Sequence, residues 1–174
     1  MDSSASGLRS TTQETLQRVT HQLRFHSMPH EYRTTRRVEW ADTDLAGIIH
    51  FANYFRYMEE VEHEFLRSLG LSVLMEHEGH QITWPRVNAA CEFARPVRFE
   101  DVLDVQLTVT RVGQKSLTFA FVFSNDSSEV ARGQLVTACC RKEADRLTAI
   151  PIPEWIRAKI DAVPVVDGPG SDLK

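Results

Sequence analysis

The stretch VEWADTDLAGIIHFANY, residues 38–54, decides how this chain is organised. Two carboxylates, Asp42 and Asp44, follow a segment typical of a strand, and Gly47 and His50 come just before a helical pattern begins. The free NH groups at the start of a helix stabilise negative charge. Carboxylates beside a helix start therefore favour an acyl-transfer or hydrolytic site.

The segments on either side have the periodicity of a strand and of a long helix. Apolar and polar residues alternate over residues 32–40, which predicts a strand that delivers both carboxylates to its end. An apolar stripe recurs at helical spacing over residues 54–69, and Gly70 is a natural helix stop. The sequence thus predicts one strong helix whose apolar stripe lies across a sheet.

Four more strands are predicted after the helix, at residues 86–94, 102–112, 116–124 and 129–141. A strand, one long helix and a run of antiparallel strands indicate an α+β domain, with the helix covering one face of the sheet. One helix leaves strand edges and a sheet face uncovered, which favours oligomerisation. A short terminal helix is predicted over residues 153–163.

The chain divides into three parts. Its 174 residues suit a single domain, which we place at residues 31–164. Residues 1–30 form an N-terminal extension that is partly helical, because apolar residues recur at helical spacing over residues 12–25. Residues 165–174 contain glycine and proline and are expected to form a loose C-terminal tail.

Composition restricts the class of protein and its partners. With 42% hydrophobic and 25% charged residues, the chain is typical of a soluble globular protein. A formal net charge of -4 gives no general attraction to nucleic acid or to anionic membranes. The sequence contains neither an apolar run of about 18 residues, which a membrane helix needs, nor the apolar core of a secretory signal. We therefore expect a cytoplasmic protein without nucleic-acid or membrane partners.

Neither a disulfide framework, nor a metal, nor a cofactor is predicted. The cysteines are odd in number, which favours reduced, buried thiols: Cys91, Cys139 and Cys140. Read as a calcium-binding loop, the stretch that starts at Asp42 has Ala46 where an oxygen ligand is needed and Asn53 where the closing glutamate belongs. His77 and His80 are three residues apart, whereas the zincin motif needs four.

Two motifs resemble those of the 4-hydroxybenzoyl-CoA thioesterase family. The run DTDLAGIIHFANY at residues 42–54 is similar to the family signature, and FARPVRFEDVL at residues 93–103 is similar to the turn between the family's second and third strands. The resemblance covers roughly residues 32–141. It implies a hot-dog fold, with a long central helix against an antiparallel sheet, an acyl-CoA substrate, and a homodimer or homotetramer whose active sites lie where subunits meet.

The resemblance assigns the chemistry to the loop and the helix start. Asp44 matches the family's catalytic aspartate, which would act as a general base on water or as a nucleophile that forms a mixed anhydride. By alignment, the backbone NH of Phe51 is the donor to the oxyanion. Gly47 would let the chain turn closely beneath the thioester, or it is a turn former alone. His50 either assists with charge near the carbonyl or caps and packs the helix start. A solvated loop position is the alternative for both Asp42 and Asp44.

Further residues are implied in substrate binding. On the helix, the resemblance implies that Tyr54 and Glu59 bind substrate. Glu62, on the same helix, stands at a position that holds arginine in many relatives. One turn matches the place where several relatives hold the CoA phosphates, and its residues are Arg111, Lys115 and Ser116. Arginine and lysine pair well with phosphate oxygens. A solvated polar turn is the alternative.

A second class of function stays open: a hot-dog protein that binds an acyl-CoA or an acyl-carrier protein without useful turnover, or one that assembles with a partner through its N-terminal extension. A hydratase fits less well, because the loop aspartate followed by Ala46 and Gly47 resembles the thioesterase branch. Hydrolysis that depends on Asp44 would separate the two classes. The sequence does not define the acyl group, because the depth of the pocket depends on residues from two chains.

Overall fold

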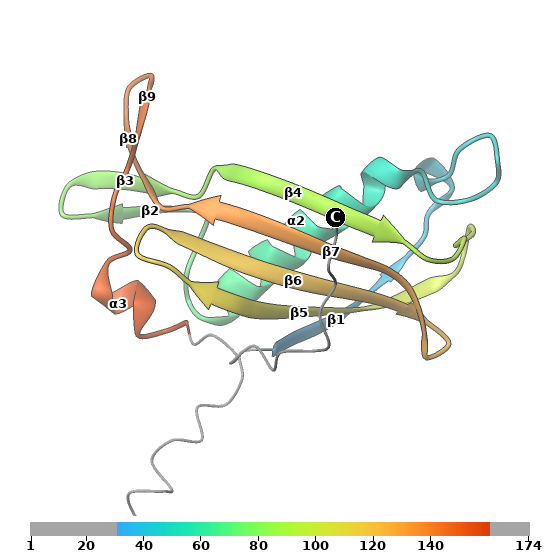
Figure 1. Cartoon of the computed structure of the whole chain (residues 1–174). Coiled ribbons are helices and arrows are strands. Elements are labelled where there is room, and N and C mark those ends of the chain that lie inside the picture. Colours follow the sequence, from blue (N-terminus) through green and yellow to red (C-terminus); the bar gives the residue numbers. More distant parts are fainter. Residues whose placement is uncertain (1–30, 161–174) are drawn as a thin grey trace, which may run out of the picture.

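The long helix α2, Phe51–Ser68, lies against one face of a five-stranded antiparallel sheet (Figure 1). The computed structural model describes residues 31–160. The strand order across the sheet is β1-β5-β6-β7-β4. The strand bounds are Glu31–Arg37 for β1, Val102–Val112 for β5, Ser116–Asn125 for β6, Ser128–Ala138 for β7 and Arg86–Phe93 for β4. The α+β arrangement expected from the sequence is confirmed.

The core lies between α2 and the sheet. Every second residue of β5 and β6 is buried along most of each strand, because successive side chains of a strand point to opposite faces. The buried helix residues Tyr54, Met58, Val61 and Phe65 recur at helical spacing. A Cβ at Gly133 of β7 would overlap the thioether of Met58. Glycine at this position therefore allows the helix to approach the sheet.

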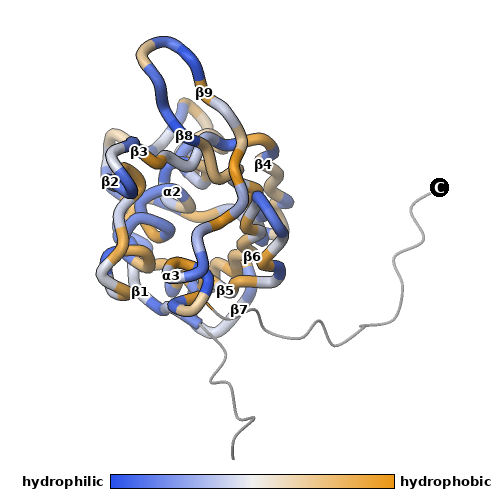
Figure 2. Tube along the Cα trace, turned by 90° about the vertical axis from the view of Figure 1, so that its left-hand side faces the viewer, coloured by the Kyte–Doolittle hydropathy of each residue, from blue (hydrophilic) through white to orange (hydrophobic). Residues whose placement is uncertain are grey.

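A smaller four-stranded sheet, ordered β2-β3-β8-β9, lies at one end of the large sheet (Figure 1). Its strands are Leu74–His77 for β2, His80–Thr83 for β3, Cys140–Glu143 for β8 and Arg146–Ala149 for β9. The β8–β9 hairpin extends away from the rest of the described chain and is mostly hydrophilic (Figure 2). The short helix α3, Glu154–Arg157, follows within the segment predicted to be helical.

Several predicted boundaries differ from the structure. The single strand predicted over residues 129–141 is wrong: the chain leaves the large sheet after Ala138, where the Cys139 NH donates to the Lys115 carbonyl (2.8 Å), and continues as β8 beside β3. The first strand ends at Arg37 rather than near residue 40, and Trp40–Asp42 forms a 3₁₀ helix. The strands of the β2–β3 hairpin and β9 have only four residues each, too few for a clear periodicity.

Some expectations concern features outside the large sheet. All three cysteines are free thiols, with Cys139 and Cys140 buried and Cys91 half-buried. Between residues 31 and 160 there is no helix both long and apolar enough to cross a membrane. The helix predicted over residues 12–25 and the tail over residues 165–174 lie outside the described residues.

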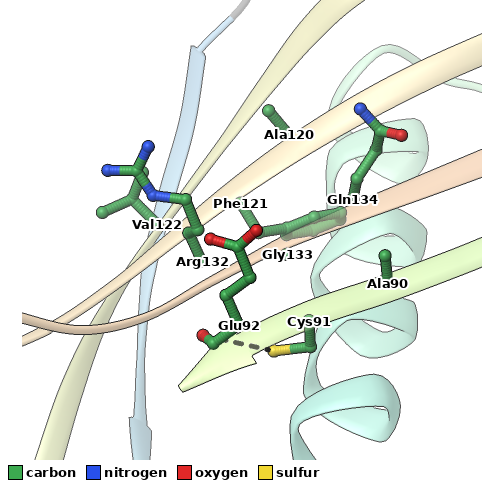
Figure 3. A pocket seen from close by; sticks show the side chains of 9 residues that line it. All are labelled: Ala90, Cys91, Glu92, Ala120, Phe121, Val122, Arg132, Gly133 and Gln134. Atoms are coloured by element: carbon green, nitrogen blue, oxygen red, sulfur yellow. Dashed lines mark hydrogen bonds between the residues drawn. The ribbon is translucent and has the colours of Figure 1, made fainter. Parts of the chain in front are cut away.

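The face of the large sheet opposite α2 is not covered by any element described between residues 31 and 160. A hollow of about 390 Å³ lies on this face. Figure 3 shows the side chains of Glu92, Arg132 and Gln134, which line it and project from β4 and β7. Ala90 and Ala120 also line it, and their small side chains leave it open. Because β1 and β4 are the edge strands, the described chain leaves one sheet face and two edges available for association.

Candidate active site

The loop that carries Asp44 is a tight hairpin between the 3₁₀ helix and α2. An antiparallel bridge joins Thr43 to Ile49, and inside it the Asp44 NH donates to the Ile48 carbonyl at 2.9 Å. The Gly47 NH donates back to the Asp44 carbonyl at 3.0 Å. Gly47 has a φ of +70°, which L-residues with a side chain rarely adopt, although a Cβ there would meet no atom within 4 Å. Backbone conformation therefore accounts for this glycine.

Asp44 is exposed and keeps one carboxylate oxygen open. Its Oδ1 accepts a hydrogen bond from the Ala46 NH at 2.8 Å. No residue between 31 and 160 donates to its Oδ2. The first contact fixes the orientation of the side chain, and the second oxygen is free to accept a proton or to attack a carbonyl carbon.

Asp44 lines a cavity of about 420 Å³ whose walls are otherwise mainly apolar. The other residues that line it are Ile48, Ile49, Phe51, Tyr54, Phe93, Ala94, Arg95, Pro96 and Val97. The Ile49 NH donates to the Val97 carbonyl at 2.8 Å, which joins the loop to the segment after β4. The cavity is therefore built from two parts of the chain that are about 50 residues apart in the sequence.

Tyr54 forms part of the cavity wall and of the core. It is 2% exposed, and its ring centroid lies 5.2 Å from that of Phe93 and 5.2 Å from that of Phe123. Burial, helped by the nearby Cys91, raises the pKa of Tyr54 to about 12, so its phenol stays protonated at neutral pH. The position of Tyr54 in the cavity wall is compatible with the expected role of this residue in substrate binding.

The start of α2 supplies backbone donors. His50 is the N-cap, and its Nδ1 accepts from the Ala52 NH at 3.3 Å while its carbonyl accepts from the Asn53 NH at 2.9 Å. Within residues 31–160, no group accepts from the NH of Phe51, and Phe51 lines the cavity. The first NH groups of a helix lack intrahelical partners, so this NH is available to a ligand oxygen. His50 itself caps the helix, which is one of the two roles expected for it, and it is not among the residues that line the cavity.

Asp42 is not a solvated loop residue. It is 4% exposed, and its carboxylate accepts hydrogen bonds from the Tyr57 hydroxyl (2.6 Å), the Glu39 NH (2.9 Å) and the Arg56 guanidinium. The solvated alternative is therefore wrong for Asp42, because a buried carboxylate needs such donors. Sequence reasoning missed this network, although Arg56 and Tyr57 lie two and three residues beyond the end of the signature.

Glu59 and Glu62 both pair with an arginine from β4. Arg86 Nη2 lies 2.6 Å from the Glu62 carboxylate and 3.4 Å from that of Glu59. Glu62 is 1% exposed, whereas the Glu59 side chain is 53% exposed and also lies 4.0 Å from His63. Neither acid lines the Asp44 cavity in the described chain. The structure thus places Glu59 apart from the cavity within one subunit.

The β5–β6 turn lies far from Asp44 within one chain. The first residues of β5 are at the Asp44 end of the sheet, because the Val38 NH donates to the Asp101 carbonyl at 2.9 Å. From there β5 runs for 11 residues, or about 35 Å, to its other end. The candidate phosphate residues Arg111, Lys115 and Ser116 are at that far end (Figure 1). The structure does not bring them together with Asp44 in one subunit.

Comparisons with known proteins agree with this architecture. The thioesterase-like superfamily is matched over residues 38–160. A 1,4-dihydroxy-2-naphthoyl-CoA hydrolase from Synechococcus sp. (strain WH7803) is 30% identical over 137 residues, covering 74% of this chain and 90% of that protein. A solved gentisyl-coenzyme A thioesterase is 28% identical, with a TM-score of 0.65, covering 75% of this chain and 100% of that one.

A third relative shows the fold at lower identity. The solved 4-hydroxybenzoyl-CoA thioesterase from Pseudomonas sp. strain CBS-3 has a TM-score of 0.65 at 20% identity, covering 74% of this chain and 98% of that one. The match to the superfamily extends over most of the chain and includes the loop, the long helix and every strand of the large sheet except β1. The chain therefore belongs to the thioesterase-like superfamily: it has the hot-dog fold and is a thioester hydrolase.

Proposed function

We propose that this chain hydrolyses an acyl-CoA to a free acid and CoA, with Asp44 as the catalytic carboxylate. The proposal rests on one observation above all. Asp44, with one open oxygen, and Phe51, whose NH has no acceptor in the described chain, line the same apolar cavity. A carboxylate and an oxyanion donor at one site are what thioester hydrolysis requires.

Two reaction courses fit these groups. In the first, Asp44 takes a proton from a water that attacks the thioester carbon, and the CoA thiolate leaves. In the second, the open Asp44 oxygen attacks the carbon itself, CoA thiolate leaves, and water hydrolyses the resulting mixed anhydride. In both, negative charge develops on the carbonyl oxygen, and we expect the Phe51 NH at the positive end of α2 to stabilise it.

We further propose that the acyl group is aromatic. The cavity walls include the rings of Phe51, Tyr54 and Phe93, and aromatic rings pack well against one another in offset or edge-to-face geometry. The names of two relatives agree, since those proteins act on 1,4-dihydroxy-2-naphthoyl-CoA and gentisyl-CoA. Gly47 would then hold the turn beneath the thioester.

The working enzyme is proposed to be a homodimer or homotetramer. The edge strand β4 exposes Val87 (62%) and Phe93 (50%), and an exposed apolar edge strand is a surface that soluble proteins normally cover. Phe93 also lines the cavity, so a partner on this edge would close the site. An assembly of this kind would also let Arg111 and Lys115 of one subunit serve the CoA phosphates of another, which they cannot do within their own chain.

The test is a thiol-release assay with short, long and aromatic acyl-CoAs, run on the wild type and on Asp44→Asn. We expect hydrolysis by the wild type and a fall in kcat of at least about 100-fold in the variant, because the charge that takes a proton or attacks is lost. Glu100→Gln is the matched control: it removes an exposed negative charge at the same end of the sheet and does not line the cavity. Equal rates in Asp44→Asn and the wild type would reject the assignment, and binding of every acyl-CoA without hydrolysis would favour the non-catalytic alternative.

A further inference from the structure

The side chain of Asp42 ties three parts of the chain together. Its carboxylate accepts from the Tyr57 hydroxyl at 2.6 Å and from the Arg56 guanidinium, both on α2, and from the Glu39 NH at 2.9 Å, which precedes the 3₁₀ helix. The side chain is only 5% exposed. Hydrogen bonds to a buried, charged acceptor are stronger than those between neutral groups. The side chain therefore fixes the 3₁₀ helix against α2.

The backbone of Asp42 holds the other end of the catalytic loop. Its carbonyl accepts from the His50 NH at 2.8 Å and from the Asn53 side-chain amide at 2.8 Å. The loop that carries Asp44 begins directly after Asp42 and ends at His50, where α2 begins. Both ends of the loop are thus attached to one residue. Asp42 itself is absent from the cavity lining, so it has no direct contact with a substrate held there.

We propose that Asp42 is a positioning residue, which holds the Asp44 carboxylate at a fixed distance from the Phe51 NH at the start of α2. This inference rests on the proposed function of Asp44. A thioester carbon has to lie close to the Asp44 oxygen while its carbonyl oxygen reaches the helix start, and both distances depend on how the loop sits on α2. A misplacement of about 1 Å in such a site costs on the order of 100-fold in rate.

The donors to Asp42 are suited to a permanent contact. Burial, and then the hydrogen bond to Asp42, raise the pKa of Tyr57 well above its usual value. The phenol therefore remains a donor over the whole pH range in which an enzyme of this kind works. The Arg56 guanidinium also lies over the Tyr57 ring, with 5.5 Å from its Cζ to the ring centroid.

The test compares Tyr57→Phe and Asp42→Ala with the wild type. Thiol release gives kcat, and a thioether analogue of the best acyl-CoA substrate gives Kd without turnover. If Asp42 positions Asp44, kcat falls by about 10- to 100-fold in both variants, while Kd stays within about twofold because the cavity walls are intact. Asp42→Asn keeps an acceptor oxygen for Tyr57 and recovers part of the rate lost in Asp42→Ala. Should Asp42→Ala fail to fold, Tyr57→Phe decides the question alone.

Arg36→Met is the control for a merely structural effect. It removes part-buried ion pairs between β1 and α2, to Glu60 at 3.2 Å and Glu64 at 2.6 Å, and none of these residues lines the cavity. We expect this variant to be less stable and to keep the wild-type kcat at temperatures where it is folded. A kcat in Tyr57→Phe no lower than in Arg36→Met would overturn the positioning role. Asp44→Asn in the same series separates the two proposals, because wild-type activity there would reject the function of Asp44 itself.

Discussion

Glu62→Gln should remove a pH dependence of stability that a buried carboxylate gives to this chain. Glu62 is 1% exposed on α2, and Arg86 of β4 lies 2.6 Å away. Burial raises the pKa of Glu62 to about 7; Arg86 acts in the opposite direction without cancelling this, and Glu59 adds to the rise. In the unfolded chain the same group would titrate near 4.5, the value of an exposed glutamate.

The sign and size of the effect follow from proton linkage. Between pH 4.5 and about 7, the folded chain keeps the Glu62 proton and the unfolded chain loses it. The free energy of unfolding therefore falls as the pH rises through this window, and the stabilisation present below pH 4.5 is lost above the folded pKa. At 1.36 kcal/mol for each pKa unit, the full change is about 3 kcal/mol.

Urea unfolding of the wild type and of Glu62→Gln at several pH values between about 5 and 8 measures this difference. His63 must be allowed for, because burial, followed by Arg86, lowers its pKa and so gives a slope of opposite sign. Subtracting the two curves removes that contribution, since both proteins contain His63. Glu64→Gln, on the same helix but paired with Arg36, should run parallel to the wild type. A parallel curve for Glu62→Gln would refute the reasoning.

Two further predictions concern the substrate and the assembly. Replacing both Arg111 and Lys115 by alanine should raise KM with kcat little changed, because phosphate contacts bind the ground state and the transition state alike; the wild-type KM should also rise with salt, and an unchanged KM in the double variant would place the phosphates elsewhere. Sedimentation at micromolar concentration should show a dimer or a tetramer, and a folded monomer would contradict the use of β4 as an interface.

The strands could be predicted where alternation alone decides them. The prediction for β5 matches its observed bounds because buried residues alternate with more exposed ones over most of its 11 positions. The break between β7 and β8 could not be seen, because residues 138–140 are an unbroken apolar run without glycine or proline, while the strand partner changes from β6 to β3. Periodicity reports which face of a strand is buried, and it says nothing about the neighbouring strand.

The same limit applies to the candidate site. Asp44, Gly47, Phe51 and Tyr54 lie within one stretch, so the sequence was enough to place them near one another. The opposite wall of the cavity depends on the hydrogen bond from the Ile49 NH to the Val97 carbonyl, a contact between distant segments. The motif at residues 93–103 marked that segment as a turn but gave no sign that its first residues line the cavity. The large distance between Lys115 and Asp44 likewise could not be predicted from the motifs, because it depends on the length of β5 in the folded sheet.

Two aspartates only two residues apart have opposite environments, and the environments suit opposite tasks. A carboxylate with donors on both oxygens, as Asp42 has from Tyr57, Arg56 and the Glu39 NH, is held in one position and has few lone pairs left for another partner. Among residues 31–160, Asp44 has a single donor, on one oxygen, which leaves the other oxygen available while the direction of the side chain is fixed. A fully satisfied carboxylate makes a good anchor and a poor base, and the reverse holds for an open one. If the Asp44 loop gains its accuracy from Asp42, the spacing of two residues is itself functional, because it places the open carboxylate immediately beyond the anchored one.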